Sequence, residues 1–473
     1  MKKFSLLLLL LCLSPCATGD GLPDLGDVSQ AVLNPAQERQ IGQQGMREIR
    51  ASRQFLDDAE INDYLNQLGN RLVENSAEPA LSFEFFAIND YNVNAFAVPG
   101  GFIGVNAGLL LTTQSESELA AVLSHEIGHV TQHHMARMLA GQQADSVASM
   151  AALAIAILAA RSNPQASQAA IVGVQAGSIQ RQLNFTRTHE QEADRTGLEI
   201  LQKSGFNVHA MPEFLDRLQK ATRLMEGNAP NYLRTHPVTS DRIADIENRV
   251  SKQPYRLIPD SLDFQLVRSK LILAQKNATD AIAYFSSALD AQKHGSPIAQ
   301  RYGLVGALLR NKEIGRARQE LAILRGQTKD DPMIETLTGQ VKRAEKNDAD
   351  ALKFYRTAVQ NFPQHRALVY DYTDLLLQNN QAETAIKLLA EQLTRHPTDT
   401  MLYDLQAHGY ALQGKRLEQH QAQAYSYAWQ GNLRAAMEQL GLAKRAGGSF
   451  YQLSTIESDM RELREILEAR EKK

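Results

Sequence analysis

The C-terminal half of the chain carries a repeated pattern that restricts its fold more than any other feature. Four related segments each place an alanine at the same point, and these alanines recur about every 34 residues, at Ala281, Ala317, Ala351 and Ala385. Prolines punctuate the same region at similar intervals, at positions 332, 363 and 397. A unit of this length forms a pair of helices that cannot bury its apolar face alone, so successive pairs must stack. The period therefore predicts an α-solenoid.

Both the period and the prolines are typical of tetratricopeptide repeats. We expect these repeats to occupy residues 262–473, with a looser register after Gly414 and a polar capping helix over residues 451–473. Such arrays bind peptides or partner proteins on a concave surface. Taken alone, this half of the chain would be a binding module.

A second feature is the segment His125-Glu126-Ile127-Gly128-His129. On a helix, its two imidazoles lie one turn apart on the same face, with the carboxylate of Glu126 beside them. The spacing of the neighbouring apolar residues and a capping-box pattern at residues 115–118 predict a helix with a buried face. Two neutral histidines and one further ligand hold zinc with one position open for water, whose pKa falls towards about 7. We therefore predict one zinc ion per chain, with His125 and His129 as ligands and Glu126 as general base.

The third ligand is absent from the same helix. Gln132 and Met135 stand where a metzincin would have a glycine and a third histidine. On a straight helix His133 lies about two turns, or roughly 11 Å, from His125, which is too far for both to bind one ion. We interpret His133 and His134 as a solvated helix end or as support for the ligands.

A pair of carboxylates further along the chain supplies the missing group. Glu190 and Asp194 fall at i and i+4 on a second predicted helix. We expect Glu190 to bind the metal and Asp194 to orient a ligating imidazole, which fixes the tautomer of that imidazole. The alternative is a charged solvent face, in which the carboxylates lie beside Arg187 and Arg195.

Alternating segments upstream predict a small sheet before the metal-binding helix. Residues 81–88, 93–98 and 102–106 have the pattern of strands, and Pro99 follows the second of them. A strand next to a proline favours a sheet edge, where an extended peptide can pair through main-chain hydrogen bonds. The alternative is a purely structural hairpin. The predicted fold class is thus mainly α with a small β-sheet.

The N-terminus has the three regions of a secretory signal peptide: two lysines, an apolar run over residues 4–13, and small residues before position 20. The apolar run is too short to span a bilayer. We expect cleavage near Gly19, and so a signal peptide at residues 1–19. Lipoprotein processing at Cys16 is the alternative, and it fits poorly because Pro15 precedes the cysteine. Both cysteines of the chain fall inside this segment, so the mature protein is expected to have no disulfide and no thiol ligand.

Two further features bear on the partners of the chain. The formal net charge of −3 does not indicate the excess of positive charge that nucleic-acid-binding proteins usually have. An alanine-rich segment at residues 147–160, followed by Pro164 and a second such run to residue 178, is too short and too interrupted to span a membrane. We expect two helices there, either packed through their small residues or in peripheral contact with a membrane surface or an unfolded client.

Three of these motifs together resemble the zinc metallopeptidase family that includes the CAAX prenyl proteases: residues 119–129, the hairpin at residues 94–101, and Glu190-x-x-Ala193-Asp194. The match covers roughly residues 61–250. This resemblance implies an α+β zincin metallopeptidase domain, which we place at residues 20–255 together with its N-terminal helices.

The resemblance also implies further candidate site residues. It implies that Asn94 and Ala95 contact the substrate. It points to His236, which Pro237 places on a loop, and to Arg242 shortly after it. The alternatives for His236 are a fourth zinc ligand that displaces the catalytic water, a contact with the transition state, and an ordinary loop histidine. Arg242 is a second candidate for a transition-state contact.

An export signal and a repeat array attached to such a peptidase resemble the periplasmic β-barrel assembly-enhancing proteases of Gram-negative bacteria. This resemblance implies proteolysis of misassembled outer-membrane β-barrel proteins. It also implies assistance to their assembly, together with the barrel-insertion machinery and the lipopolysaccharide translocon. The alternative is a chaperone or assembly scaffold based on the repeats, with latent or minor protease activity.

Overall fold

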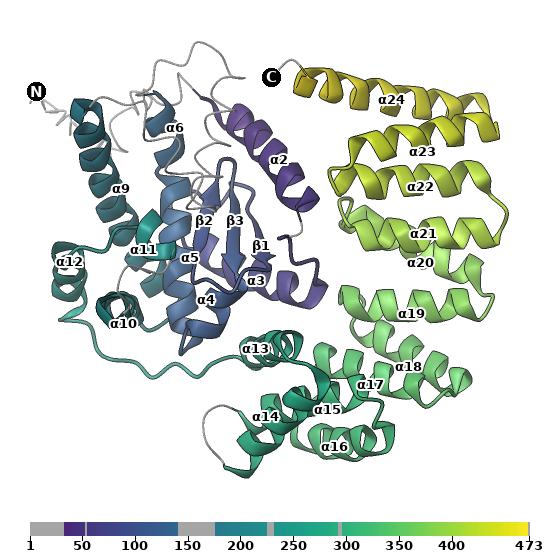
Figure 1. The fold of residues 1–473 in the computed structure, drawn as a ribbon, viewed down its shortest axis with the longest axis horizontal. Coiled ribbons are helices and arrows are strands. Elements are labelled where there is room, and N and C mark those ends of the chain that lie inside the picture. Colours follow the sequence, from purple (N-terminus) through teal and green to yellow (C-terminus); the bar gives the residue numbers. More distant parts are fainter. Residues whose placement is uncertain (1–32, 53, 141–175, 225–230, 292–295, 472–473) are drawn as a thin grey trace, which may run out of the picture.

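The computed structural model describes residues 33–52, 54–140, 176–224, 231–291 and 296–471. The predicted export signal and the alanine-rich segment at residues 147–160 lie outside the described residues. The described part is mainly helical and contains one small sheet (Figure 1), which confirms the predicted fold class.

The N-terminal part of the molecule surrounds the sheet with helices (Figure 1). Its elements are α2 (Pro35–Ala51), α3 (Ala59–Val73), β1 (Glu84–Ile88), β2 (Ala95–Val98), β3 (Phe102–Asn106), α4 (Ala107–Thr112), α5 (Glu116–Thr131), α6 (His134–Ala140), α9 (Ala176–Lys203), α10 (Ala210–Leu224), α11 (Asn231–Thr235) and α12 (Ser240–Val250).

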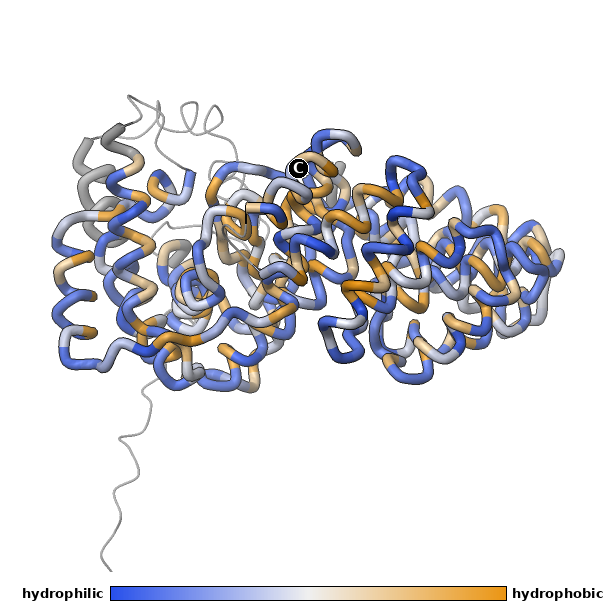
Figure 2. Tube along the Cα trace, turned by 90° about the horizontal axis from the view of Figure 1, so that it is seen from below, coloured by the Kyte–Doolittle hydropathy of each residue, from blue (hydrophilic) through white to orange (hydrophobic). Residues whose placement is uncertain are grey.

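The C-terminal part is an array of helices in which each packs on its neighbours along the chain (Figure 1). Its elements are α13 (Leu262–Gln275), α14 (Ala278–Asp290), α15 (Pro297–Arg310), α16 (Ile314–Gln327), α17 (Pro332–Ala344), α18 (Asp348–Asn361), α19 (Arg366–Gln378), α20 (Ala382–Arg395), α21 (Thr400–Leu412), α22 (Arg416–Trp429), α23 (Leu433–Ala446) and α24 (Phe450–Glu471). Orange and blue alternate along these helices in Figure 2, as expected when each helix buries one face. The four repeat alanines that set the period are all fully buried, which explains why only a small residue recurs there.

The sheet has one closed edge. Its strand order is β1-β3-β2, with β1 parallel and β2 antiparallel to β3. On the outer side of β1, Asn66 accepts from the backbone N–H of Phe85 at 3.0 Å and donates to its carbonyl at 2.7 Å. Asn62, one turn earlier on α3, accepts from the N–H of Ala87 at 2.8 Å. These two asparagines satisfy the edge that would otherwise pair with another strand, so the other edge of the sheet belongs to β2.

Helix α5 lies at the centre of this part, and every one of its residues except His129 is buried. Ser115 caps it by accepting from the N–H of Glu118 at 3.3 Å. The carboxylate of Glu118 reaches back to the N–H of Gln114 at 2.7 Å and also accepts two hydrogen bonds from Arg217 of α10. The reciprocal bond of the predicted capping box therefore falls one residue earlier than expected.

Helix α9 crosses α5 at very short range because the residues at the crossing are small. A Cβ at Gly128 would lie 3.0 Å from the carbonyl oxygen of Ala193, and a Cβ at Gly197 would lie 2.9 Å from the backbone nitrogen of His125. Any larger residue at these points would push the two backbones apart. The close crossing is what brings the α9 carboxylates to the α5 imidazoles.

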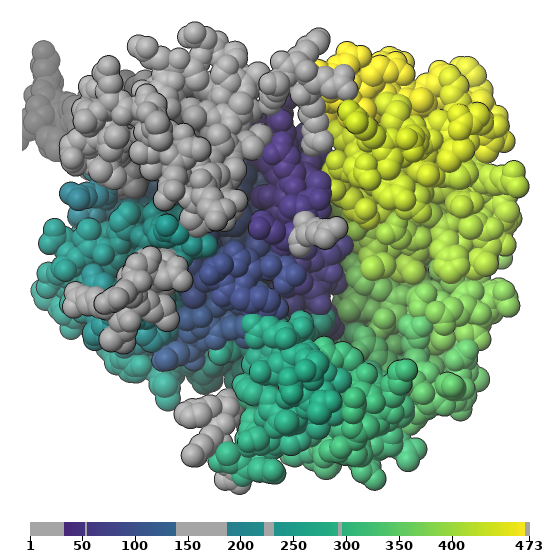
Figure 3. All heavy atoms as spheres, viewed as in Figure 1, coloured from purple at the N-terminus to yellow at the C-terminus, as the bar shows by residue number. Residues whose placement is uncertain are grey.

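The repeat array curves around the α3 side of the N-terminal part (Figures 1 and 3). Arg366, at the start of α19, forms an ion pair with Asp63 of α3 at 2.7 Å. His365 Nε2 lies 3.0 Å from Glu60, which also pairs with Lys270 of α13 at 2.5 Å. Burial raises the pKa of Glu60, but the charge of Lys270 and the contact with His365 outweigh burial and lower that pKa to about 2. Glu60 is 4% exposed, and these partners offset the cost of burying its charge.

The turn between α22 and α23 touches α2 on the same side of the molecule, since a Cβ at Gly431 would lie 2.3 Å from the carbonyl oxygen of Arg47. Within the described ranges, no helix combines the length and the apolar character needed to cross a membrane.

A substitution at the crossing of α5 and α9 tests its importance for stability. We expect Gly197→Ala to lower the free energy of unfolding by about 1–3 kcal/mol, because the added methyl group meets backbone atoms that cannot move independently. Gly326→Ala is the matched control, since nothing lies within 4 Å of a Cβ added there; it should leave stability unchanged or raise it by up to about 1 kcal/mol. Chemical denaturation of both variants checks this. Equal effects of the two changes would contradict the packing argument.

Candidate metal centre

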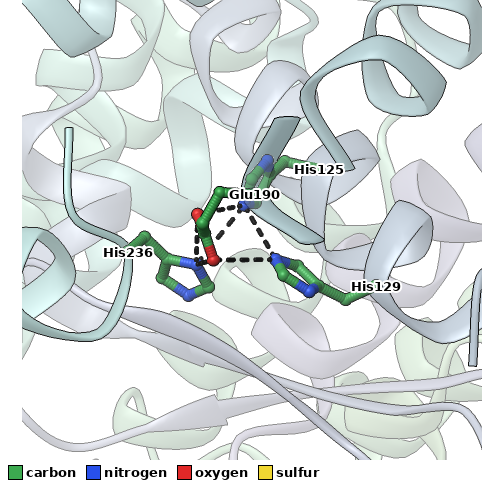
Figure 4. A group of neighbouring side chains, drawn as sticks. All are labelled: His125, His129, Glu190 and His236. Atoms are coloured by element: carbon green, nitrogen blue, oxygen red, sulfur yellow. Dashed lines mark hydrogen bonds and ion pairs between the residues drawn. The ribbon is translucent and has the colours of Figure 1, made fainter. Parts of the chain in front are cut away.

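Four side chains from three parts of the chain converge on one point (Figure 4). They are His125 and His129 of α5, Glu190 of α9, and His236, which follows α11. One ligand atom from each lies within 4.8 Å of the others. His125 Nε2 is 3.0 Å from His129 Nε2, and Glu190 places its two carboxylate oxygens 3.5 Å from His125 Nε2 and 3.4 Å from His129 Nε2.

The donor set fits a tetrahedral metal ion. Ligand atoms about 2 Å from such an ion lie about 3.3 Å from one another, which matches the separations of 3.0–3.5 Å among these groups. Imidazole nitrogens and a carboxylate, without a thiolate, are ligands that zinc accepts. Burying several lone pairs face to face is costly unless a cation lies between them. The geometry therefore favours a cation at the point where the four side chains meet.

The orientation of His125 is fixed by a carboxylate. Its Nδ1 lies 3.0 Å from Asp194 Oδ1, one turn after Glu190 on α9. Burial opposes a charge on His125, but hydrogen bonds to Asp194 and Glu190 raise its pKa to about 10. This site therefore attracts positive charge, and a bound cation takes the place of the proton.

Arg242 of α12 holds both α9 carboxylates. Its Nε and Nη2 donate to the two oxygens of Asp194 at 2.7 and 2.8 Å, and its Nη1 lies 2.9 Å from Glu190 Oε2. Burial opposes the charge on Arg242, but the hydrogen bonds and charges of these carboxylates raise its pKa. Since the same Nη1 also donates to the carbonyl of Pro237 at 2.8 Å, all three guanidinium nitrogens are engaged.

Glu190 remains ionised in this environment. Burial would raise its pKa, but the charge of His236 and the contacts with His125 and His129 lower it well below its usual value. Burial lowers the pKa of His129, which leaves this imidazole neutral, as a metal ligand must be.

His236 is completely buried and faces the other three residues (Figure 4). The short helix α11 positions it: the N–H of Tyr232 bonds to the carbonyl of Val93, and the N–H of His236 bonds to the carbonyl of Tyr232. The Tyr232 ring lies against the imidazole, with ring centroids 4.8 Å apart. His236 Nδ1 is then 3.3 Å from His125 Nε2 and 3.1 Å from Glu190 Oε1.

Glu126 differs from every other charged group of the site. Its side chain is 1% exposed, and neither carboxylate oxygen accepts a hydrogen bond from any residue that the structure describes. The nearby His236 Nε2, at 3.4 Å, also has no hydrogen-bond partner within those residues. An unsatisfied carboxylate beside converging metal ligands is costly for folding and indicates a group kept for chemistry.

The two predicted substrate contacts lie beside the site but are themselves buried. Asn94 is 2% exposed, and its side-chain oxygen accepts from Thr235 Oγ1 at 3.4 Å. Ala95 is 0% exposed and pairs with Val105 of β3. A cavity of about 50 Å³ lies further along β2, lined by Ala97 and Val98 together with His129 and Glu190.

The histidines after α5 are not a solvated helix end, since His133 is 8% and His134 4% exposed. His133 Nδ1 lies 3.2 Å from Glu38 of α2. His134 Nδ1 lies 2.9 Å from His129 Nδ1. The other interpretation, support for the ligands, agrees with the position of His134.

Three residues near the site had no signal in the sequence analysis: Tyr232, Arg137 and Glu192. Tyr232 and Arg137 belong to no recognisable spacing. Glu192 lies between Glu190 and Asp194 in the sequence, but at i+2 it falls on a different face of the helix from these two residues, so their spacing did not indicate it.

Comparisons with known proteins agree with this geometry. The profile of peptidase family M48 matches residues 59–250, and that of the tetratricopeptide repeat matches residues 273–341 and 343–409. The chain is 34% identical to the beta-barrel assembly-enhancing protease of Yersinia pestis over 421 residues, which are 88% of this chain and 86% of the relative. It is 31% identical to the protein of the same name from Escherichia coli strain K12 over 429 residues, which cover 90% and 87% of the two chains.

Another relative matches a smaller share of the chain. The mitochondrial metalloendopeptidase OMA1 of Schizosaccharomyces pombe is 33% identical over 184 residues, which are 39% of this chain and 51% of OMA1. The bacterial relatives, by contrast, match nearly the whole chain. The chain therefore belongs to peptidase family M48, and it is a zinc metalloendopeptidase with tetratricopeptide repeats that resembles the beta-barrel assembly-enhancing proteases.

Proposed function

We propose that this protein is a periplasmic zinc-dependent endopeptidase that degrades misassembled outer-membrane β-barrel proteins and assists their assembly. The observation that carries the chemistry is the buried, unsatisfied carboxylate of Glu126 beside the converging His125, His129 and Glu190. The substrate class rests on the names of the bacterial relatives that match about nine-tenths of the chain. In this proposal residues 1–19 are an export signal, residues 20–255 are the peptidase domain, and residues 262–473 bind clients and the assembly machineries.

The proposed division of labour follows from the contacts. His125, His129 and Glu190 hold one zinc ion, which supplies Lewis acidity for peptide hydrolysis. Glu126 takes the proton of the attacking water and returns it to the leaving amine. Asp194 orients His125, and Arg242 holds Asp194 and Glu190 in place. Since the guanidinium of Arg242 is fully engaged, we assign it this positioning role in preference to a transition-state contact.

The substrate is proposed to lie as a strand along the outer edge of β2. The carbonyl of Asn94 accepts from the N–H of Asn106, so bonded and non-bonded pairs alternate from that point along β2 and β3. The backbone groups of Ala95 and Ala97 therefore point away from β3. Ala97 also lines the cavity beside His129. A peptide paired there would pass the metal ligands.

At rest, His236 is proposed to occupy the fourth metal position and to keep the enzyme latent. Its Nδ1 is as close to His125 and Glu190 as the accepted ligands are to one another. Opening requires a shift of the segment after α11. Helix α11 itself contacts the β1–β2 loop, because the N–H of Tyr232 donates to the carbonyl of Val93. This arrangement couples the strand that would bind the substrate to the residue that would block the metal.

The alternative function is a repeat-based chaperone or scaffold with minor protease activity. The array packs on α3 through Arg366 and on α2 through the turn at Gly431, whereas the residues that line the cavity beside His129 all belong to the peptidase part. The complete set of ligands and base favours the enzyme, because the loss of Glu126 alone would abolish the chemistry while keeping the metal. The two activities are compatible within one chain.

Replacing the base tests the chemistry. We expect Glu126→Gln to keep one zinc per chain and to lower cleavage of an unfolded β-barrel protein by about 10²-fold or more, because a positioned base contributes about 10²–10⁴-fold. Metal analysis and gel-based cleavage assays on the full chain measure both quantities. Unchanged proteolysis would exclude Glu126 as the base.

Removing His236 tests latency. We expect His236→Ala to raise the cleavage rate by about tenfold or more. A tenfold rise corresponds to a loss of about 1.4 kcal/mol from the free energy that favours the resting state, in which His236 occupies the metal site. A fall in rate would indicate a transition-state contact instead, and an unchanged rate would make His236 an ordinary loop histidine. Both outcomes contradict latency.

A proline in β2 tests strand pairing. Ala97→Pro removes an N–H that points away from β3 and leaves the β2–β3 hydrogen bonds intact. We expect kcat/KM for an unfolded substrate to fall about tenfold, the value of one main-chain hydrogen bond. Ala97→Ser keeps the N–H and is the control. If both variants cleave equally well, the substrate does not pair there.

A further inference from the structure

We propose that His134 is a positioning residue that fixes the tautomer of the zinc ligand His129. In this arrangement the Nδ1–H of His129 donates to Nδ1 of His134, and the lone pair of His129 Nε2 is left facing the metal. The inference rests on the proposed function, since it takes His129 as a zinc ligand.

A chain of four groups leads away from the metal site through His134. His129 Nδ1 lies 2.9 Å from His134 Nδ1, and His134 Nε2 lies 3.1 Å from Glu192 Oε2. Arg137 Nη1 donates to the same oxygen of Glu192 at 2.7 Å. The chain begins at a metal ligand and ends at a carboxylate–guanidinium ion pair.

The order of donors along this chain is determined from its outer end. A carboxylate accepts hydrogen bonds and cannot donate one, so the contact with Glu192 requires the proton of neutral His134 to sit on Nε2. Nδ1 of His134 is then an acceptor, and the close Nδ1 of His129 must carry the proton between them. A neutral imidazole has one N–H, so Nε2 of His129 is bare. The metal-binding tautomer of His129 thus follows from a carboxylate two contacts away.

The burial and packing of His134 agree with this role. The residue is 4% exposed, so an additional charge on its imidazole would be costly. The ring of His189 stacks on it at a centroid distance of 4.1 Å and an interplanar angle of 5°. The His129 ring meets it nearly edge to face, at 78°. The stack fixes the plane of the His134 ring, and in that plane its two nitrogens lie within hydrogen-bond distance of His129 and Glu192.

The backbone explains how His134 reaches His129. On a straight helix, residues five apart lie about 140° apart around the axis, because each residue turns about 100°. Here α5 ends at Thr131, and His133 adopts φ = 49°, in the left-handed region that costs a non-glycine residue about 1–2 kcal/mol. This turn starts α6 at His134 and folds the imidazole back towards α5. Backbone strain of this kind is typical of functional sites.

The two zinc histidines would then be supported in parallel ways. His125 donates directly to Asp194, which Arg242 holds. Among the described residues no carboxylate contacts Nδ1 of His129, and His134 connects this nitrogen to Glu192 and Arg137. A purely structural tie between α5 and α6 is the competing explanation, and it predicts an effect on stability alone.

Variants at both ends of the chain separate the two explanations. His134→Phe keeps a flat ring but removes the acceptor, and we expect it to weaken zinc binding by about 10–100-fold, the usual effect of losing a group that orients a ligand. His134→Asn keeps an acceptor on Cγ, where Nδ1 was attached, and should bind zinc within about threefold of the parent chain. Glu192→Gln removes the fixed acceptor at the far end and should weaken binding by about 3–10-fold.

Zinc affinity is measured on the full chain by competition with a chelator, with thermal unfolding of the zinc-free proteins alongside. Asp245→Asn is the matched control for Glu192→Gln. Asp245 of α12 is a partly exposed carboxylate that pairs with Arg195, and Arg195 lies on α9 like Glu192. Zinc affinity should not change in this control. Histidine ¹⁵N spectra of the zinc-free chain should show the proton of His129 on Nδ1, and this preference should disappear in His134→Phe.

Two results would overturn the proposal: zinc affinity in His134→Phe equal to that of the parent, or an equal loss in His134→Asn and His134→Phe. If the parent chain itself binds no zinc, the proposed ligand set fails and the role of His134 fails with it. A parent that binds zinc while His134→Phe binds it as tightly overturns only the role of His134.

Discussion

The close crossing of α5 and α9 is the contact on which the peptidase part depends. Gly197 lies against the backbone of His125, and Gly128 lies against Ala193, so the two helices approach at the level of the ligands. At this separation Glu190 reaches both α5 imidazoles and Asp194 reaches the back of one of them. Longer side chains at the crossing would separate the carboxylates from the imidazoles, and the remaining charges would be buried without partners.

The other elements of the peptidase part determine what surrounds the metal site. The asparagines of α3 close the β1 edge of the sheet, which leaves the β2 edge beside the cavity for an extended substrate. Helix α11 links the loop before β2 to His236, because the N–H of Tyr232 donates to the carbonyl of Val93 and the N–H of His236 donates to the carbonyl of Tyr232. The repeats lie against α3 and α2 and leave the cavity to the peptidase part. Client binding by the repeats and cleavage at the metal would then occur on separate surfaces of one molecule.

Much of this organisation was predictable from the sequence, since it depends on periodic or short-range patterns. The 34-residue period, the alternating strands and the spacing of His125, Glu126 and His129 each follow from local geometry, and the helical spacing of Glu190 and Asp194 pointed to the second ligand segment. Contacts between distant segments left no such pattern. Arg242 holds Asp194 only because α12 packs on α9. The position of His134 depends on the left-handed backbone conformation of His133, which cannot be predicted from a histidine in the sequence.

X-ray absorption at the zinc edge of the full-length resting protein tests the central claim most directly. We predict one zinc per chain with four ligands, three imidazole nitrogens and one carboxylate oxygen, from His125, His129, His236 and Glu190. A shell with two imidazoles, a carboxylate and a water would contradict the resting role of His236. A chain without zinc, or a zinc bound through other residues, would contradict the proposed site itself.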